Sequence, residues 1–310
     1  MPRWLRVALP LVGTAAGLAW IATHVSFRDA GDALARIPVA TFVLAAALVA
    51  ANVVAGAVRW RTLMRAYGAR RIPPLGWLVR LYFVAFFYNN YLPGAVAGDV
   101  GRGIVARDVF VEEGGSQGAT GALAVVLVER ALGLFALFAL LAVGLVASGG
   151  AVESRALWWW TAIGGTGSCV LVAAIPIARR LERVLPGPLA RIAARLPALH
   201  DRGAFVQSIA LSIVTQALIA VAGWALLAAL GPIDLGASLL VVPLAAATTF
   251  LPITVGGAGA REAVYVELCG RLFGWPKADA LAASLGLWLA HLAVGAVGGV
   301  MQLAAKRRGS

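Results

Sequence analysis

The residues of this chain that could bind a polar ligand are concentrated in two interruptions of otherwise apolar sequence. The first interruption carries two amides, a carboxylate and a guanidinium, and the second carries an adjacent guanidinium and carboxylate: Asn89, Asn90, Asp99, Arg102, Arg261 and Glu262. A guanidinium pairs well with phosphate, and a neutral amide both donates and accepts hydrogen bonds. The two interruptions therefore predict a site for a phosphate-bearing ligand, with Arg102 and Arg261 as the phosphate-binding residues.

A further couple of charges, Glu129 and Arg130, lies in the middle of an apolar run. Charges at membrane depth are costly and are normally paired or functional. We therefore count this couple with the candidate substrate-binding residues. We also expect ion pairs between the segments, such as Glu129 or Glu262 with Arg102 or Arg261, although the sequence does not select the partners.

Prolines and glycines in the two interruptions predict that each contains a turn. Proline ends a helix because it lacks a backbone donor, and glycine lets the chain reverse tightly. The expected turn residues are Pro93, Gly94, Gly98, Pro252, Gly256, Gly257 and Gly259. Asp99 would then cap a following short helix. In the alternative, Asp99 and Arg102 form a structural pair three residues apart on one helix face.

The composition is that of a membrane protein. Hydrophobic residues make up 61% of the 310 residues and charged residues only 13%, whereas soluble domains contain about half and a quarter. The net charge of +12 comes largely from short basic clusters that flank apolar runs, which is a topology signal and not a nucleic-acid groove. We expect an all-α, multi-pass protein of a bacterial-type inner membrane. Its expected partners are membrane lipids, with a homo-oligomer left open.

Apolar runs predict about six full spans, near residues 7–23, 39–58, 119–147, 158–178, 204–230 and 280–304. Basic clusters place both termini and the segments 59–80 and 179–203 in the cytoplasm. The segments 81–107 and 239–273 must then each return to the side they left, as re-entrant hairpins from opposite faces. This gives about eight membrane segments. The competing topology, in which both segments cross the membrane, would leave an arginine-rich loop outside.

This topology predicts one transmembrane domain, 1–310, built from two inverted repeats. Residues 39–147 form the first repeat and residues 204–304 form the second, each with one hairpin. Transporters with inverted repeats bind their substrates near the midplane, where the repeats meet. We therefore expect the site between the two hairpin tips.

No cofactor is expected. His24, His200 and His291 are scattered and match no metal-ligand spacing, and Cys169 and Cys269 lie far apart in apolar surroundings. The sequence has no phosphate-binding loop and no Ser/His/Asp arrangement. We accordingly predict no catalytic residue.

Three motifs resemble the lysylphosphatidylglycerol synthase transmembrane-domain, or flippase-like, family. They are N-x-x-L-P-G-x-x-x-G-D-x-x-R from Asn89 to Arg102, E-R-x-x-G from Glu129 to Gly133, and L-P-x-x-x-G-G-x-G-x-R-E from Leu251 to Glu262. The element Arg59–Trp60–Arg61 is also similar to one of that family. Two positions depart from the usual pattern, namely Ala97, where a glycine is common, and Gly133, near a common aspartate.

The resemblance implies an inner-membrane protein that moves amphiphilic lipids between leaflets. Family members are associated with aminoacylated phosphatidylglycerol, polyprenyl-phosphate-linked sugars and hopanoid pathways. No loop is long enough for the soluble synthase domain of the full-length enzymes, so we expect no lipid synthesis. Our leading hypothesis is a lipid flippase or flippase-like transporter. The alternatives are a membrane-embedded enzyme that acts on a lipid-linked substrate and a transporter of small solutes or ions.

Overall fold

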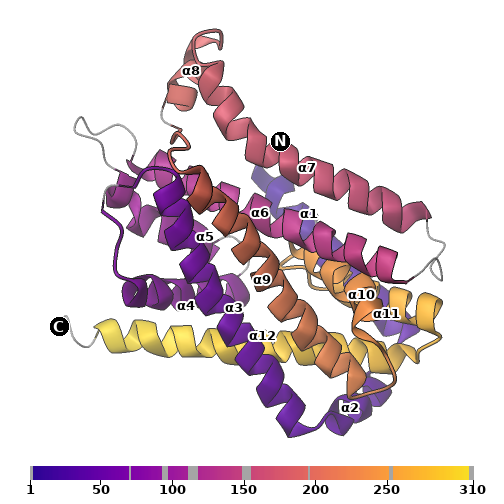
Figure 1. Cartoon of the computed structure of the whole chain (residues 1–310). Coiled ribbons are helices and arrows are strands. Elements are labelled where there is room, and N and C mark those ends of the chain that lie inside the picture. The colour runs from indigo at the N-terminus through magenta and orange to yellow at the C-terminus, as the bar shows by residue number, and fades with distance from the viewer. Residues whose placement is uncertain are drawn as a thin grey trace.

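The computed structural model describes residues 3–69, 71–92, 97–110, 118–148, 155–194, 196–250 and 254–306. All regular structure in these ranges is helical (Figure 1). The helices are α1 (Arg3–His24), α2 (Phe27–Arg36), α3 (Val39–Ala66), α4 (Leu75–Tyr91), α5 (Ala97–Val105), η1 (Arg107–Phe110), α6 (Gly118–Ala147), α7 (Arg155–Arg180), α8 (Gly187–Ala194), α9 (Arg202–Ala228), α10 (Leu235–Ala247), η2 (Thr248–Phe250), α11 (Ala260–Phe273) and α12 (Lys277–Lys306).

Within the described ranges, five helices are long and apolar enough to cross a membrane: α3, α6, α7, α9 and α12. Helices α1 and α2 form a pair bent by 85°, which makes a sixth span if the pair is counted as one. The prediction of an all-α, multi-pass membrane protein is confirmed. The predicted first span, 7–23, lies in α1, and the remaining predicted spans lie in the five long helices.

Helix α3 is longer than the span predicted at 39–58. The predicted span ended at the first arginine, but the helix continues through Arg59 to Ala66. Its last turns remain part of the core because Trp60, Leu63 and Met64 are fully buried. Arg59 is also buried, so it belongs to the interior and not to a cytoplasmic loop.

The first interruption forms two short helices, α4 and α5, that pack against each other. The Gly98 backbone N–H donates to Asn89 Oδ1 at 2.8 Å. A Cβ atom at Gly98 would lie 1.9 Å from the carbonyl oxygen of Ala85, so only glycine permits this approach. Gly98 therefore lies inside α5 and contacts α4. The predicted turn residues Pro93 and Gly94 lie outside the described residues.

The second interruption likewise forms a packed pair, α10 and α11. In the segment that precedes α11, Gly256, Gly257 and Gly259 have φ values of 61°, 81° and 84°. Residues that have a Cβ atom rarely adopt these φ values, so the path of the backbone depends on these glycines. Pro252 lies outside the described residues. Helices α4 and α10 begin at Leu75 and Leu235, before the predicted hairpins at 81–107 and 239–273.

The central helices pack in matching pairs. Helix α3 packs along α9, while α4 packs on α12 and α10 packs on α6. Contacts of α3 with α4 and of α5 with α6 correspond to contacts of α9 with α10 and of α11 with α12. Among these eight helices, α3, α4, α5 and α6 therefore correspond in that order to α9, α10, α11 and α12. Each packed pair becomes another packed pair, or the same one, when the corresponding helices are exchanged.

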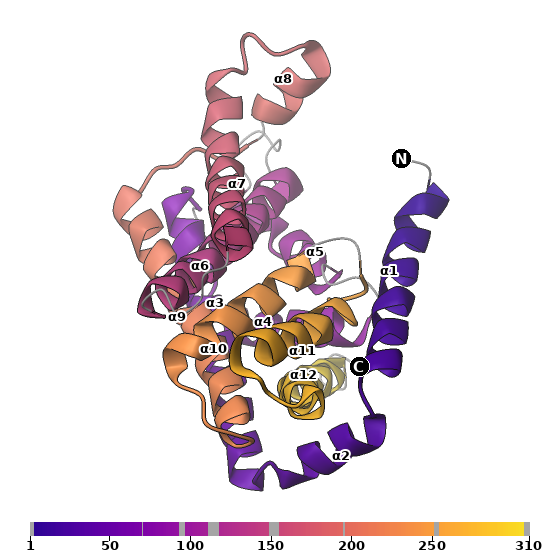
Figure 2. The ribbon, with the colours of Figure 1, turned by 90° about the vertical axis from the view of Figure 1, so that its right-hand side faces the viewer.

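The remaining helices lie around this centre. Helix α7 packs on α6, and α8 lies at one end of the molecule while α2 lies at the other, as Figures 1 and 2 show. Helix α1 packs on α11, where a Cβ atom at Gly17 would come within 2.8 Å of the Gly259 Cα atom. The Thr14 hydroxyl accepts a hydrogen bond from Val255 N at 2.8 Å. Helix α1 is thus seated on the segment that leads into α11.

Candidate functional site

Most of the predicted intramembrane charges meet in one place. Three arginines and two acidic residues from three helices, α3, α5 and α6, form ion pairs with one another, and we name them the buried charge cluster: Arg59, Asp99, Arg102, Glu129 and Arg130. Arg102 and Glu129 are 2% and 1% exposed. Three guanidiniums therefore share two carboxylates, and Arg130, with 24% of its side chain exposed, is the most accessible of them. Such an arrangement is stable only while every partner stays in place.

Arg102 lies at the centre of the buried charge cluster. Its Nε donates to Asp99 Oδ1 at 2.9 Å, and its Nη2 lies 2.6 Å from Glu129 Oε2. Its Cζ atom lies 4.7 Å from the ring centroid of Trp60 and 4.5 Å from that of Tyr82. A guanidinium between two aromatic faces gains cation–π attraction in addition to its ion pairs. Arg102 therefore links α5 to α3, α4 and α6.

Glu129 connects the cluster to two further helices. Its Oε1 accepts hydrogen bonds from Arg59 Nη2 at 3.0 Å and from the Tyr82 hydroxyl at 2.5 Å. On the other side of Arg59, Nη1 donates to the hydroxyls of Ser212 at 3.3 Å and Thr215 at 3.1 Å, both on α9. The expected pairing of Glu129 with Arg102 is present. Arg59 and Tyr82 join them, although the sequence patterns did not indicate that they would.

Asp99 is not a helix cap. Helix α5 begins at Ala97, so Asp99 lies in its first turn, and the expectation of an N-cap is wrong. The carboxylate pairs with Arg102, which agrees with the alternative prediction of a structural pair on one helix face. It also accepts a hydrogen bond from Arg130 Nε at 2.8 Å. The physical reason is that two guanidiniums are stronger partners for a carboxylate than backbone N–H groups.

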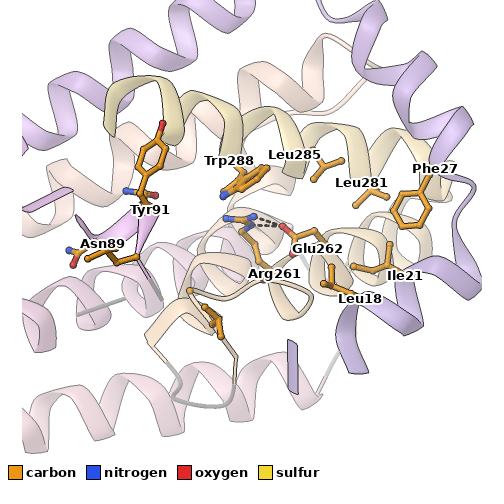
Figure 3. A pocket seen from close by; sticks show the side chains of 15 residues that line it. Leu18, Ile21, Phe27, Asn89, Tyr91, Arg261, Glu262, Leu281, Leu285 and Trp288 are labelled. Carbon is orange, nitrogen blue, oxygen red and sulfur yellow. Dashed lines mark hydrogen bonds and ion pairs between the residues drawn. The ribbon is translucent and has the colours of Figure 1, made fainter. Parts of the chain in front are cut away.

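Two adjoining cavities lie beside the cluster. The first, the apolar cavity, has a volume of about 460 Å³ and is lined by the end of α4, by the segment that leads into α11 and by the start of α11. Its apolar walls are side chains of α1, α2 and α12: Leu18, Ile21, Phe27, Leu281, Leu285 and Trp288 (Figure 3). The second, the polar cavity, has a volume of about 240 Å³. It is lined on one side by α3, α4 and α6 and on the other by residues from α9 to α12. Its polar lining residues are Asn52, Asn89, Asn90, Gln216, Thr249, Arg261, Tyr265 and His291.

Four residues line both cavities, namely Asn89, Asn90, Gly256 and Arg261. Two of them belong to α4 and two to the second interruption, so both interruptions meet at this boundary. Figure 3 shows Asn89 on one side of Arg261 and the aliphatic lining residues on the other. A ligand that spans the boundary would contact apolar walls at one end and hydrogen-bonding groups at the other.

Arg261 and Glu262 form an ion pair with each other. Arg261 Nε donates to Glu262 Oε1 at 2.9 Å, and Arg261 Nη2 also contacts that oxygen. Glu262 Oε2 accepts from the Gly259 backbone N–H at 2.7 Å, which satisfies a donor at the start of α11. The expected pairing of Glu262 with Arg102 does not occur. Both partners of the Glu262 carboxylate, Arg261 and the Gly259 N–H, instead belong to the second interruption. Arg261 Nη1 has no hydrogen-bond partner within the described ranges.

The candidate binding residues thus fall into two groups. Asn89, Asn90, Arg261 and Glu262 line the cavities, whereas Asp99, Arg102, Glu129 and Arg130 form the buried charge cluster. The groups are neighbours, because the Arg130 Cζ atom lies 5.8 Å from the ring centroid of Phe250, which lines the polar cavity.

Sequence reasoning missed several residues of the polar cavity. Asn52 on α3 and Gln216 on α9 line it, as do Tyr265 and His291. The signal that could have found the first two is a lone amide side chain in an otherwise apolar span. Tyr265 gave no such signal, because a tyrosine in a membrane helix is usual.

The comparison with protein families agrees with the motifs. No curated protein matches the chain. The family described as the lysylphosphatidylglycerol synthase TM region matches residues 5–299, a range that includes both interruptions, the buried charge cluster and the two cavities. The chain therefore belongs to the lysylphosphatidylglycerol synthase TM region family of membrane proteins.

Proposed function

We propose that this protein is a lipid transporter of the flippase type, which moves an anionic amphiphile between the leaflets of the inner membrane. The observation that carries the proposal is the boundary between the two cavities at Arg261. Apolar walls lie on one side of that guanidinium and hydrogen-bonding side chains lie on the other. An amphiphile has the same order of parts: tails, phosphate and headgroup.

The phosphate of the transported lipid pairs with Arg261 in this proposal. The hydrogen bonds that Arg261 makes to Glu262 use Nε and Nη2, so Nη1 remains for the ligand. The lipid tails lie along Leu18, Ile21 and Leu281, and the headgroup enters the polar cavity. Arg102 does not bind the phosphate in this proposal, because it lines neither cavity. Its Nε and Nη2 face Asp99 and Glu129, and its Nη1 is buried.

The buried charge cluster has a positioning role in the proposal. It joins α5 to α3, α4, α6 and, through Arg59, to α9. Asn89 at the end of α4 is in turn held to Gly98 on α5. The cluster therefore supports the wall of the cavity that α4 provides, although its charges are not at the cavity surface.

The two packed pairs, α4–α5 and α10–α11, are re-entrant hairpins of two inverted repeats in this proposal. The matching pattern of helix contacts supports it, because a two-fold exchange of the repeats requires each contact to have a counterpart in the other repeat, or, like that of α3 with α9, to map onto itself. The basic clusters support an orientation with both termini in the cytoplasm. The hairpins then enter from opposite faces, and described residues of both, Asn89 and Asn90 of the first and Gly256 and Arg261 of the second, line the cavity boundary.

Transport without chemical change is favoured over catalysis by the state of Glu262, the acidic residue of the cavity lining. Both of its oxygens accept hydrogen bonds, Oε1 from Arg261 and Oε2 from the Gly259 backbone. These contacts hold the carboxylate within the protein, at the start of α11. We therefore expect the lipid to leave the protein chemically unchanged.

The proposal is tested by lipid scrambling in proteoliposomes that contain the purified protein. The probe is an acyl-labelled phosphatidylglycerol, and scrambling is measured by quenching from the outside. We expect Arg261→Ala to reduce the scrambling rate by about tenfold or more, as the loss of a charged hydrogen bond implies. Arg271→Ala is the matched control, because Arg271 lies on the same helix with its side chain 80% exposed.

Equal scrambling by the wild type and by Arg261→Ala would contradict the assigned phosphate site. Mass spectrometry of the recovered lipid distinguishes the enzymatic alternative, since a modified headgroup would identify catalysis.

A further inference from the structure

The single charged side chain among the described lining residues of the polar cavity indicates the kind of headgroup that fits. Arg261 is the only guanidinium or ammonium among its described lining residues, and no carboxylate lines it. Resting on the proposed function, we infer that the transported headgroup carries an uncharged, hydroxyl-bearing group beyond its phosphate and no ammonium group.

The three asparagine side chains of the cavity are held in fixed orientations by hydrogen bonds. Asn89 Oδ1 accepts from the Gly98 N–H at 2.8 Å, whereas the Nδ2 atoms of Asn52 and Asn90 donate to the carbonyl oxygens of Thr215 and Phe86 at 2.7 and 2.8 Å. Asn89 therefore has its Nδ2 donor left for a ligand, and Asn52 and Asn90 each have their Oδ1 acceptor left. The cavity offers donors and acceptors together.

A mixed set of this kind matches hydroxyl groups. A hydroxyl both donates and accepts, whereas an ammonium only donates and a phosphate only accepts. Gln216, which lines the same cavity, adds an amide with both functions. A glycerol, inositol or sugar headgroup satisfies such a lining, and an ammonium would satisfy the acceptors alone.

Tyr265 supplies an independent sign of a ligand. Its side chain is fully buried and lines the polar cavity, yet its hydroxyl has no hydrogen-bond partner among the described residues. Leaving a buried hydroxyl unpaired is unfavourable, because the group has lost its hydrogen bonds to water. A ligand hydroxyl in the cavity removes that cost.

The acidic residues nearby are unavailable to a cationic headgroup. Glu262 accepts from Arg261 and from the Gly259 backbone, while Asp99 and Glu129 are paired within the buried charge cluster. An ammonium in the polar cavity would therefore lie near Arg261 without a free carboxylate. Like charges placed together and removed from water repel each other strongly.

The inference is tested in proteoliposomes with three acyl-labelled probes that share the same tails: phosphatidylglycerol, lysyl-phosphatidylglycerol and phosphatidic acid. We expect phosphatidylglycerol to be scrambled at least about tenfold faster than lysyl-phosphatidylglycerol, which corresponds to one lost hydrogen bond to a charged group or more. Lysyl-phosphatidylglycerol scrambled as fast as or faster than phosphatidylglycerol overturns the inference and leaves the proposed function standing. Absence of scrambling with all three probes overturns the proposed function itself.

The variant Tyr265→Phe removes only the hydroxyl that the inference pairs with the ligand. We expect it to slow phosphatidylglycerol by about three- to tenfold, the value of one hydrogen bond, and to leave phosphatidic acid unchanged because that probe lacks the glycerol headgroup. Gln216→Leu is a second variant with the same expected selectivity. Tyr67→Phe is the control, because Tyr67 lines neither of the two cavities. An equal effect of Tyr265→Phe and Gln216→Leu on both probes overturns the inference.

Discussion

Arg59 and Glu129 form a buried ion pair, with 3.0 Å between Arg59 Nη2 and Glu129 Oε1, although 70 positions separate them in the chain. Arg59 comes from α3 and Glu129 from α6. The same carboxylate group also contacts Arg102 and Tyr82. One glutamate thus joins α3, α4, α5 and α6, and its loss would leave two guanidiniums without their main counter-charge.

Replacing that carboxylate should therefore lower the stability of the protein. We expect Glu129→Gln to reduce the free energy of unfolding by about 3–5 kcal/mol, the usual cost when one partner of a buried ion pair is removed. The measurement is unfolding of the purified protein in detergent micelles, by heating and by titration with a denaturing detergent.

The matched control for this change is Glu267→Gln. Glu267 pairs with Arg271 four residues along α11, with side-chain exposures of 35% and 80%. Exposed pairs of this kind contribute about 0.3–0.5 kcal/mol. Similar losses in the two variants would show that the buried charge cluster is not the anchor that its geometry implies.

A second prediction concerns the contact between α4 and α5. Gly98→Ala places a Cβ atom 1.9 Å from the carbonyl oxygen of Ala85, so α5 must move away from α4. We expect a loss of stability of about 1–3 kcal/mol, as in other overpacked interiors. Lipid scrambling should also slow, because Asn89 is held by the Gly98 N–H.

Helix α5 offers its own control in Gly101→Ala. A Cβ atom at Gly101 meets nothing within 4 Å. Alanine is the better helix former by about 1 kcal/mol, so this variant should be as stable as the wild type or more stable. If both alanine variants behaved alike, the close approach at Gly98 would not be the limiting contact.

A third prediction tests the orientation in the membrane. In a background with Cys169→Ser and Cys269→Ala, single cysteines are introduced by Pro232→Cys and Arg183→Cys, both at exposed positions. The basic clusters place residue 183 in the cytoplasm and residue 232 outside. A membrane-impermeant thiol reagent added to intact cells should label only the cysteine at position 232. The reverse labelling pattern would contradict the proposed orientation.

The sequence alone determined the class of the protein and the position of its breaks. Apolar runs of about 20 residues require helices, because a lipid environment leaves backbone groups no other partner. The spans α3, α6, α7, α9 and α12 are accordingly where the apolar runs placed them. Glycines and prolines likewise marked both interruptions, since their backbone restrictions act locally.

The ends of elements were less predictable because they depend on distant partners. Helix α3 continues past Arg59 because Glu129, Ser212 and Thr215 satisfy that guanidinium. Helix α5 begins before Asp99 because the carboxylate has two arginine partners. In both cases a tertiary contact outweighs the local preference from which the boundary was predicted.

Only the tertiary structure decided which charges pair and which residues face the cavities. A low dielectric requires that buried charges be paired, but this requirement does not select the partners, because any opposite charge at the same depth would serve. The lateral packing of α3, α4, α5 and α6 places Arg102 beside Glu129, and the two form an ion pair. Glu262 instead pairs with the adjacent Arg261 at the start of α11. The same packing brought Asn52, Gln216 and Tyr265 together around one cavity. Residues from distant parts of the chain form that lining, and no local spacing encodes it.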